Sequence, residues 1–311
     1  MNSEFASPKF DQNQADQYLN ELSQLASSKL GVLSGGTPQE LPKGLAIIES
    51  LRRSSVSFGD PRNELIQLTE ETFKDSGTEL TSVYKQQMQT QFDFYYMTLT
   101  VDMLPQPGAQ FRRLTCELDF SPKGTNQPIV QTIFPNQQWR EVLSYSVGMK
   151  VGLNGNLDWS AGVDSAHLAQ IVGALPSSLK ANASNTGEFS SVVAIPEYKY
   201  SLGQTEITAL GQGNSNCYWR LQNQEIQRIG TARFGTVFKV PKGTNAITLN
   251  GTVWAEPDMN WLTADIRDVF LELMNRFGSI SRNKEEVASQ FSRGAAEQWQ
   301  LNLPKAVAAT I

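Results

Sequence analysis

The chain has 311 residues, of which 40% are hydrophobic and 18% are charged, and its formal net charge at pH 7 is −5. This length and composition are typical of a globular protein with one large domain or two ordinary ones. The acidic balance argues against a nucleic-acid surface, because phosphate binding needs a basic excess or a concentrated basic patch.

Residues 1–30 are polar and lack the apolar segment of a secretory signal peptide. No run approaches the roughly 18 apolar residues that would predict a transmembrane helix. We therefore expect a cytoplasmic protein in which the thiols of Cys116 and Cys217 stay reduced.

The first 90 residues are predicted to form a helical arm or layer. Apolar residues recur at helical spacing over 11–30, and Gly31 follows as a natural C-terminal stop. Asp60-Pro61 has the pattern of a helix start, a capping residue followed by proline at the first helical position. Shorter helices are expected over residues 45–51, from 60 to 73, and over 80–88.

Strand-like segments dominate from residue 91 to about residue 262. Residues 92–104 are rich in aromatic and β-branched side chains, which favour a strand. Asn154-Gly155 predicts a two-residue hairpin turn, because its flanks alternate between apolar and polar side chains. More strands are expected over 114–120, 189–200, 205–210, 217–221 and 231–240, with a helical interruption near 164–175. Short strands separated by turns are typical of a β-sandwich.

The end of the chain is predicted to be an antiparallel helical hairpin over 263–303. Its first helix has a clear amphipathic stripe that begins at Ile266, and Gly278 ends it. The second helix, over 283–301, is based on a weaker apolar stripe that includes Phe291.

The pentapeptide Pro-Lys-Gly-Thr-Asn occurs twice, at 122–126 and at 241–245. Each copy follows a strand-like run and precedes a Pro-x-x-x-Trp sequence, which ends at Trp139 in the first case and at Trp261 in the second. We interpret this shared order as an internal duplication of a β unit.

The predicted fold is therefore a mainly β, internally duplicated β-sandwich with helices at both ends of the chain, α+β overall. The predicted division is a helical arm over 1–90, a first β half over 91–175, a second β half over 188–262 and the helical hairpin over 263–303. Whether the two β halves form one sandwich or two is left open by these patterns.

The repeated pentapeptide has the composition of a three-residue hairpin loop, in which proline presets φ and glycine takes a left-handed conformation. Turn chemistry alone explains the motif. In the alternative interpretation both loops present polar side chains to one partner, and the candidate binding residues are Lys123, Thr125, Asn126, Lys242, Thr244 and Asn245.

Trp139 and Trp261 are most simply aromatic anchors of the core beside the sheet edge. The alternative is that they stack on sugar rings, as in a carbohydrate-binding module. Such modules are usually secreted, and the expected cytoplasmic location does not favour this alternative.

Catalytic residues are not predicted. His167 is the one histidine, and neither a Ser nor a Cys is recognisably presented beside it. Ser177 and Lys180 match Ser-x-x-Lys, but the partner motifs of that enzyme class are absent. Two distant cysteines and one histidine cannot form a closed zinc site without carboxylates. We expect no catalytic residue, no cofactor and no metal.

The favoured function is that of a non-enzymatic structural or protein-interaction protein, a subunit of an assembly that binds a protein partner or itself. The 25 Gln and 19 Asn residues suit polar, weakly charged contacts. Two alternatives stay open: a carbohydrate-binding module, and a membrane-acting, pore-forming-like β protein. The second would use residues 188–210 as a membrane hairpin, because they alternate in polarity.

Overall fold

The computed structural model describes residues 10–32, 40–75, 80–136, 150–153, 159–162, 205–224, 226–276 and 284–305. Several predictions lie outside these residues: the helix near 164–175, the strand over 189–200, and the positions of Trp139, His167, Ser177 and Lys180. Of the predicted membrane hairpin over 188–210, only residues 205–210 are described, and they contain one strand.

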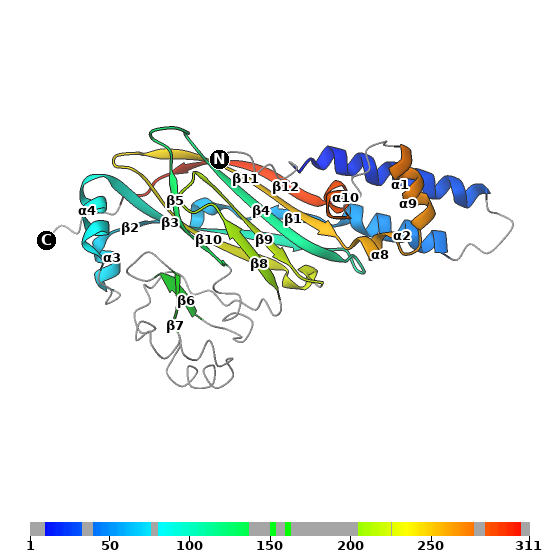
Figure 1. The fold of residues 1–311 in the computed structure, drawn as a ribbon, viewed down its shortest axis with the longest axis horizontal. Helices are drawn as coiled ribbons and strands as arrows, with labels where there is room; N and C mark the ends of the chain where they lie inside the picture. Colours follow the sequence, from blue (N-terminus) through cyan, green and yellow to red (C-terminus); the bar gives the residue numbers. More distant parts are fainter. Residues whose placement is uncertain are drawn as a thin grey trace.

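Two antiparallel sheets form the body of the protein, which confirms the mainly β, sandwich-like fold (Figure 1). The first sheet has the order β1-β3-β10-β5, and β2 also pairs with β3. Its strands are β1 (Ser55–Phe58), β2 (Leu65–Leu68), β3 (Phe92–Leu104), β5 (Ile129–Phe134) and β10 (Thr231–Pro241). The second sheet has the order β12-β11-β4-β9-β8. Its strands are β4 (Phe111–Ser121), β8 (Glu206–Leu210), β9 (Asn216–Gln222), β11 (Ala246–Pro257) and β12 (Arg293–Asn302).

Aromatic side chains from the two sheets meet in the core between them. Phe120 of β4 packs on Phe238 of β10 with ring centroids 4.9 Å apart, and Trp219 of β9 packs on Phe234 of β10 at 5.0 Å. These four side chains are almost completely buried. Each buried ring removes a large apolar area from water, so its truncation to alanine would cost about 3–5 kcal/mol.

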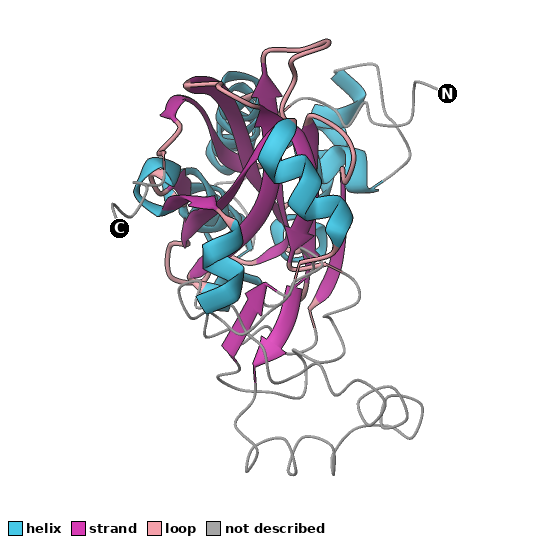
Figure 2. Cartoon of the chain, turned by 90° about the vertical axis from the view of Figure 1, so that its left-hand side faces the viewer, coloured by secondary structure: helices cyan, strands magenta, loops and turns pink. Residues whose placement is uncertain are grey.

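Helices lie at both ends of the sandwich (Figure 1). At one end are α1 (Gln12–Val32), α2 (Glu40–Arg53), α8 (Met259–Thr263), α9 (Arg267–Arg276) and α10 (Lys284–Gln290). At the other end are α3 (Glu70–Asp75) and α4 (Ser82–Thr90). Figure 2 shows the strands at the centre of the molecule with helices around them. No helix in the described part of the chain is long and apolar enough to cross a membrane.

Helix α1 begins where the carboxylate of Asp11 accepts hydrogen bonds from the backbone N–H groups of Asn13 and Gln14. The helix is fastened to the start of β12, because Arg293 donates to Asp16 in an ion pair. Burial alone would raise the pKa of Asp16, but the hydrogen bonds from Arg293 and then Gln12 outweigh it and lower that pKa. The predicted helix over 11–30 is confirmed and is held to the sheet by charge as well as by packing.

The predicted helical arm over 1–90 also contains strands. Asp60 does cap a helix that starts at Pro61, but this is a single 3-10 turn, η1 (Pro61–Glu64). Strand β2 follows at once, and pairs with the middle of β3. Leu65 and Leu68 are both buried in this strand. Their spacing of three residues puts them on one face of a helix but on opposite faces of a strand, so pairing with β3 overrides the local helical pattern.

The predicted C-terminal helical hairpin over 263–303 needs a correction. Helix α9 confirms its first helix, but the second helix ends at Gln290 in α10. Residues Arg293–Asn302 are strand β12, which pairs along its length with β11. Trp299 and Leu301 are buried and alternate with exposed residues, as a strand requires. The weak apolar stripe that predicted a helix over 283–301 therefore corresponds to a helix only as far as Gln290.

The predicted two-residue turn at Asn154-Gly155 lies outside the residues that the structure describes. Strands β6 (Lys150–Leu153) and β7 (Trp159–Gly162) do pair as a hairpin. Their register places Leu153 opposite Trp159.

The two sheets have matching strand orders. In the first sheet β10 lies between β3 and β5, and in the second β4 lies between β9 and β11. The consecutive strands β3, β4 and β5 therefore alternate between sheets, and so do β9, β10 and β11. We call β3–β5 and β9–β11 the two trios. Exchanging one trio for the other converts the strand order β3-β10-β5 of the first sheet into the order β9-β4-β11 of the second. Since both trios contribute to both sheets, the two predicted β halves form one sandwich.

The repeated pentapeptides link the sheets. Residues 122–126 lead from β4 to β5, and residues 241–245 lead from β10 to β11. The predicted hairpins are wrong, because the flanking strands pair with strands of the other trio and not with each other. The left-handed glycines are confirmed, with φ of 95° at Gly124 and 84° at Gly243.

Candidate functional site

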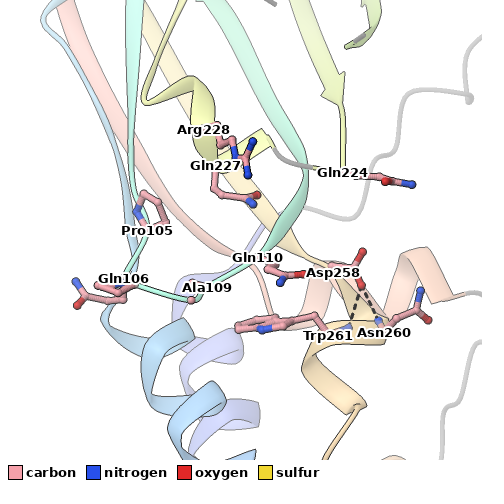
Figure 3. Close-up of a pocket in the computed structure, with 12 residues that line it drawn as sticks. Pro105, Gln106, Ala109, Gln110, Gln224, Gln227, Arg228, Asp258, Asn260 and Trp261 are labelled. Carbon is pink, nitrogen blue, oxygen red and sulfur yellow. Dashed lines mark hydrogen bonds between the residues drawn. The ribbon is translucent and has the colours of Figure 1, made fainter. Parts of the chain in front are cut away.

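An open groove of about 850 Å³ lies at the α8 end of the sandwich (Figure 3). Three segments form it: the β3–β4 connection, the β9–β10 connection, and the start of α8 after β11. The lining residues are Pro105, Gln106, Pro107, Gly108, Ala109, Gln110, Gln224, Gln227, Arg228, Asp258, Asn260 and Trp261. The β3–β4 and β9–β10 connections hold corresponding places in the two trios, so the groove lies where the trios meet.

Backbone hydrogen bonds fix these three segments to one another. The N–H of Asp258 donates to the carbonyl of Gln110 at 3.0 Å, which joins the start of α8 to the β3–β4 connection. The N–H of Phe111 donates to the side-chain carbonyl of Gln227 at 3.1 Å, which joins β4 to η3 (Ile226–Ile229) in the β9–β10 connection. The lining is therefore attached to paired strands on all sides, and we expect a preformed groove.

Asp258 sets the position of Trp261. Its carboxylate accepts from the N–H groups of Asn260 at 2.8 Å and Trp261 at 3.0 Å, which caps α8 directly after β11. The indole is half-buried and packs against the edge of the core. In Figure 3 the ring is seen nearly edge-on below the groove, with Gln227 and Arg228 on the opposite side. Trp261 is thus both a core anchor and a wall of the groove.

Uncharged hydrogen-bonding groups dominate the lining. Five of the lining side chains are amides, those of Gln106, Gln110, Gln224, Gln227 and Asn260. In the described part of the lining the charged residues are one acid, Asp258, and one base, Arg228. Since Asp258 already accepts two backbone N–H groups, its carboxylate serves the helix cap. The groove is suited to binding a polar, uncharged ligand.

Neither a metal centre nor a thiol nucleophile is found in the described part of the chain. Within those residues no group of three or more His, Cys, Asp or Glu side chains is placed to hold a metal. Cys116 and Cys217 are buried between the sheets, and burial, reinforced by nearby acidic groups, raises the pKa of both thiols. They stay protonated at neutral pH and are poor nucleophiles.

The pentapeptide loops lie at the other end of the sandwich. Ile129, where the first loop joins β5, pairs with Lys239, which lies two residues before the second motif on β10. Both loops are therefore at the end that carries α3 and α4, away from the groove (Figure 1). The predicted binding residues of the loops and Trp261 do not form one site.

The two lysines of the loops are engaged within the chain. Lys123 contacts Asp119 and donates to the hydroxyl of Ser215 at 2.7 Å. Lys242 donates to the carbonyl of Met88 at 2.6 Å and lies 3.7 Å from the carboxylate of Asp93. Each lysine thus reaches the segment that leads into the neighbouring strand, β9 in one case and β3 in the other.

The other loop residues differ between the two copies. Thr244 donates to the carbonyl of Pro241 at 2.6 Å, which closes its own turn, and the carbonyl of Asn245 accepts from Leu303 at 2.9 Å. Thr125 and Asn126 are exposed. The first loop therefore presents more of its polar surface to solvent than the second.

No protein-family model matches the chain, and no curated protein matches it. Solved structures give weak likenesses. A pore forming protein is 5% identical with a TM-score of 0.30, over 66% of this chain and 78% of that chain. The collagen binding subdomain ACE19 of the Enterococcus faecalis surface protein ACE is 5% identical with a TM-score of 0.25, over 68% of this chain and 87% of that chain. The Clostridium perfringens NetB toxin in its membrane-inserted form is 8% identical with a TM-score of 0.25, over 53% of this chain and 77% of that chain. Scores this low do not establish a common fold, and no family assignment follows from them.

Proposed function

We propose that the chain is a non-enzymatic binding protein, in which the β-sandwich is a scaffold for the groove beside α8. The observation that carries this proposal is the composition of the groove: amide side chains around the indole of Trp261. A concave site with an aromatic wall and several convergent polar groups is the usual form of a binding site. Its backbone is tied to both sheets, which suits recognition without rearrangement.

The non-enzymatic part of the proposal is supported by the chemistry of the lining. General acid–base catalysis needs a side chain that can exchange a proton near the operating pH. Among the described lining residues there is one carboxylate, that of Asp258, and it is held in a helix cap. An arginine side chain donates hydrogen bonds but accepts none, and the amides carry no ionisable group. These groups can orient a ligand, and they are poorly suited to proton transfer.

The groove can be tested before its natural ligand is known. Isotope-labelled tryptophan gives one indole N–H signal for each of the six tryptophans. The variant Trp261→Phe removes one signal and so assigns it. We expect polar probes at about 10 mM to shift the Trp261 signal. A binding free energy of about −3 kcal/mol already gives a Kd near 10 mM. The probes are neutral hexasaccharides, acetyl-tetraglycine amide, decaproline and inorganic phosphate.

The buried indole of Trp219 is the internal control for this titration, because its side chain is fully enclosed between the sheets. Its signal should stay in place while that of Trp261 moves. If no probe shifts the Trp261 signal, the groove is not a binding site and the proposal fails.

We also propose self-association, which a specific feature of the second sheet favours. Strand β12 (Arg293–Asn302) is the last strand of that sheet, and within the described residues its outer edge pairs with no other strand. Its solvent face carries amides such as Gln298 and Gln300, which bond to Asn250 and Thr248 of β11. The backbone N–H of Gly294 donates to the side chain of Gln12 at 3.1 Å, so the part of the edge that can add a strand from a second copy begins after Gly294.

Light scattering tests this second proposal. We expect a mass above that of one chain, and a return to the mass of one chain when Gln298 and Gln300 are both replaced by lysine, because edge charges oppose strand addition. A wild-type mass equal to that of one chain would contradict self-association and leave the groove unaffected.

We further infer that the two strand trios descend from one duplicated unit. The inference is supported by the matching strand order, by the equal place of the two pentapeptides between sheets, and by the register. Near the motifs, Lys239 of β10 pairs with Ile129 of β5, and Phe120 of β4 pairs with Leu249 of β11, so the register of the two copies agrees to within one residue.

A further inference from the structure

We infer that the groove beside α8 binds an uncharged carbohydrate chain, with the indole of Trp261 as the stacking surface. This inference rests on the binding function proposed above and names the chemical class of the ligand. A sugar ring has an apolar C–H face and a rim of hydroxyl groups, so it needs an aromatic plane next to groups that both donate and accept hydrogen bonds. The groove brings these two features together.

The aromatic plane is fixed before any ligand arrives. The backbone N–H of Trp261 donates to Asp258, and the half-buried indole packs against the core edge. Figure 3 shows the ring below the groove, with space between it and the side chains of Gln227 and Arg228. Stacking on such a preordered ring loses little side-chain entropy, which favours weakly held ligands such as sugars.

The amides supply both kinds of hydrogen-bonding group. A glutamine side chain has a carbonyl that accepts and an NH₂ that donates, and a sugar hydroxyl uses both. Gln110 and Gln224 are exposed, and no hydrogen bond within the described part of the chain occupies their side chains. Gln227 uses its carbonyl for Phe111 and keeps its NH₂ group. Gln106 is turned away and donates to the carbonyl of Arg53 at 3.4 Å.

The charges of the lining exclude ionic ligands as the best occupants. Among the lining residues that the structure describes, one acid and one base, Asp258 and Arg228, balance each other in charge. A phosphate or a carboxylate-rich ligand would need an excess of basic groups. A neutral hydroxylated chain needs no such excess.

An extended peptide fits less well. Peptides that add to a sheet need an unpaired strand edge, and the groove is lined by connections and a helix start. The strands that lead into it, β3, β4, β10 and β11, are paired on both sides. A proline-rich helix on an aromatic surface is the remaining peptide mode, and it is tested below with decaproline.

The test is a titration of the full-length chain with cellohexaose, xylohexaose, maltohexaose and chitohexaose, followed through the Trp261 indole signal. We expect at least one of them to bind with a Kd of about 0.1–1 mM. Trp261→Ala should weaken binding at least about tenfold, because a stacked ring contributes more than about 1 kcal/mol. Since that variant lacks the indole signal, its binding is measured by calorimetry.

A second pair of variants removes the risk that Trp261→Ala fails to fold. Gln110→Ala and Gln224→Ala change exposed side chains and should fold normally. Each should weaken hexasaccharide binding about twofold to tenfold, which corresponds to one lost hydrogen bond. Gln212→Ala in the β8–β9 turn is the matched control, an exposed glutamine that is not part of the groove lining, and should bind as the wild type does.

The outcomes separate this inference from the proposed function. If decaproline or acetyl-tetraglycine amide shifts the Trp261 signal and no hexasaccharide does, the ligand class is wrong and the binding function stands. If no probe shifts the signal, both are wrong. If a hexasaccharide binds equally well to Trp261→Ala, Gln110→Ala and Gln224→Ala, it binds elsewhere and the inference is overturned.

Discussion

Replacing Arg113 with methionine should destabilise the protein by about 3–5 kcal/mol in urea denaturation at neutral pH. The guanidinium of Arg113 lies 2.9 Å from the carboxylate of Glu256, and both side chains are less than a tenth exposed. Arg113 also donates to Gln222 at 3.2 Å, and Glu256 accepts from the indole of Trp254 at 3.3 Å. The variant would leave a buried carboxylate without its positive partner, and that desolvated charge is what destabilises the fold.

The double variant Arg113→Met, Glu256→Leu is the matched control for this prediction. It removes both charges and fills similar volume with apolar atoms, so it should recover most of the lost stability. The pair joins β4 to β11 on the face of the second sheet that is turned away from the core. Equal destabilisation in the single and double variants would show that packing of the arginine stem, and not its charge, is what matters.

Gly211→Ala should destabilise the protein by about 3 kcal/mol or more. Gly211 follows β8 and has a φ of 124°, a left-handed conformation that side chains rarely adopt. A Cβ atom there would lie 2.3 Å from the carbonyl oxygen of Asn216 and 2.4 Å from the Cα of Cys217. Both are backbone atoms of the adjacent strand, so the β8–β9 hairpin would have to open to make room.

Gly213 offers a matched control within the same turn. Its φ is 83°, but a Cβ atom there would meet nothing within 4 Å. Gly213→Ala therefore adds conformational strain without a clash, and should cost only about 1 kcal/mol. If the two alanine variants unfold at the same denaturant concentration, the close approach at Gly211 is not what the hairpin depends on.

Elements with strong local signals could be predicted from the sequence. Strand β3 (Phe92–Leu104) and helix α9 (Arg267–Arg276) each carry a long apolar pattern of one period, and each is present in the structure. The left-handed Gly124 and Gly243 follow from turn chemistry, which depends on a few neighbouring residues. The β-sandwich follows from the number and spacing of short strands.

Features that depend on distant partners could not be predicted. A Pro-Lys-Gly-Thr-Asn loop closes a hairpin only if its two flanking strands pair, and here β4 pairs with β9 and β11. Residues of β12 became a strand because β11 offers an edge at that place. Neither partner can be read from the local pattern, because tertiary pairing overrides local preference.

Of the groove residues, only Trp261 could be singled out from the sequence. Trp261 stood out because of the repeated Pro-x-x-x-Trp, and carbohydrate stacking was one of its two interpretations. The glutamines carry no such signal, because glutamine is common throughout this chain. Gln110, Gln224 and Gln227 could have been grouped from one observation: they occupy the connections after β3 and after β9, which correspond in the two trios.

The exchange of strands between the trios has a consequence for the chain as it leaves the ribosome. When β3, β4 and β5 have been made, β4 and β5 have none of their partners, because β9, β10 and β11 are still to be translated. At about 5–20 residues per second, that delay is on the order of ten seconds. During it the apolar face of β4, with Leu114, Leu118 and Phe120, has no sheet to cover it. We expect the nascent chain to need a chaperone that holds exposed strands until synthesis is nearly complete.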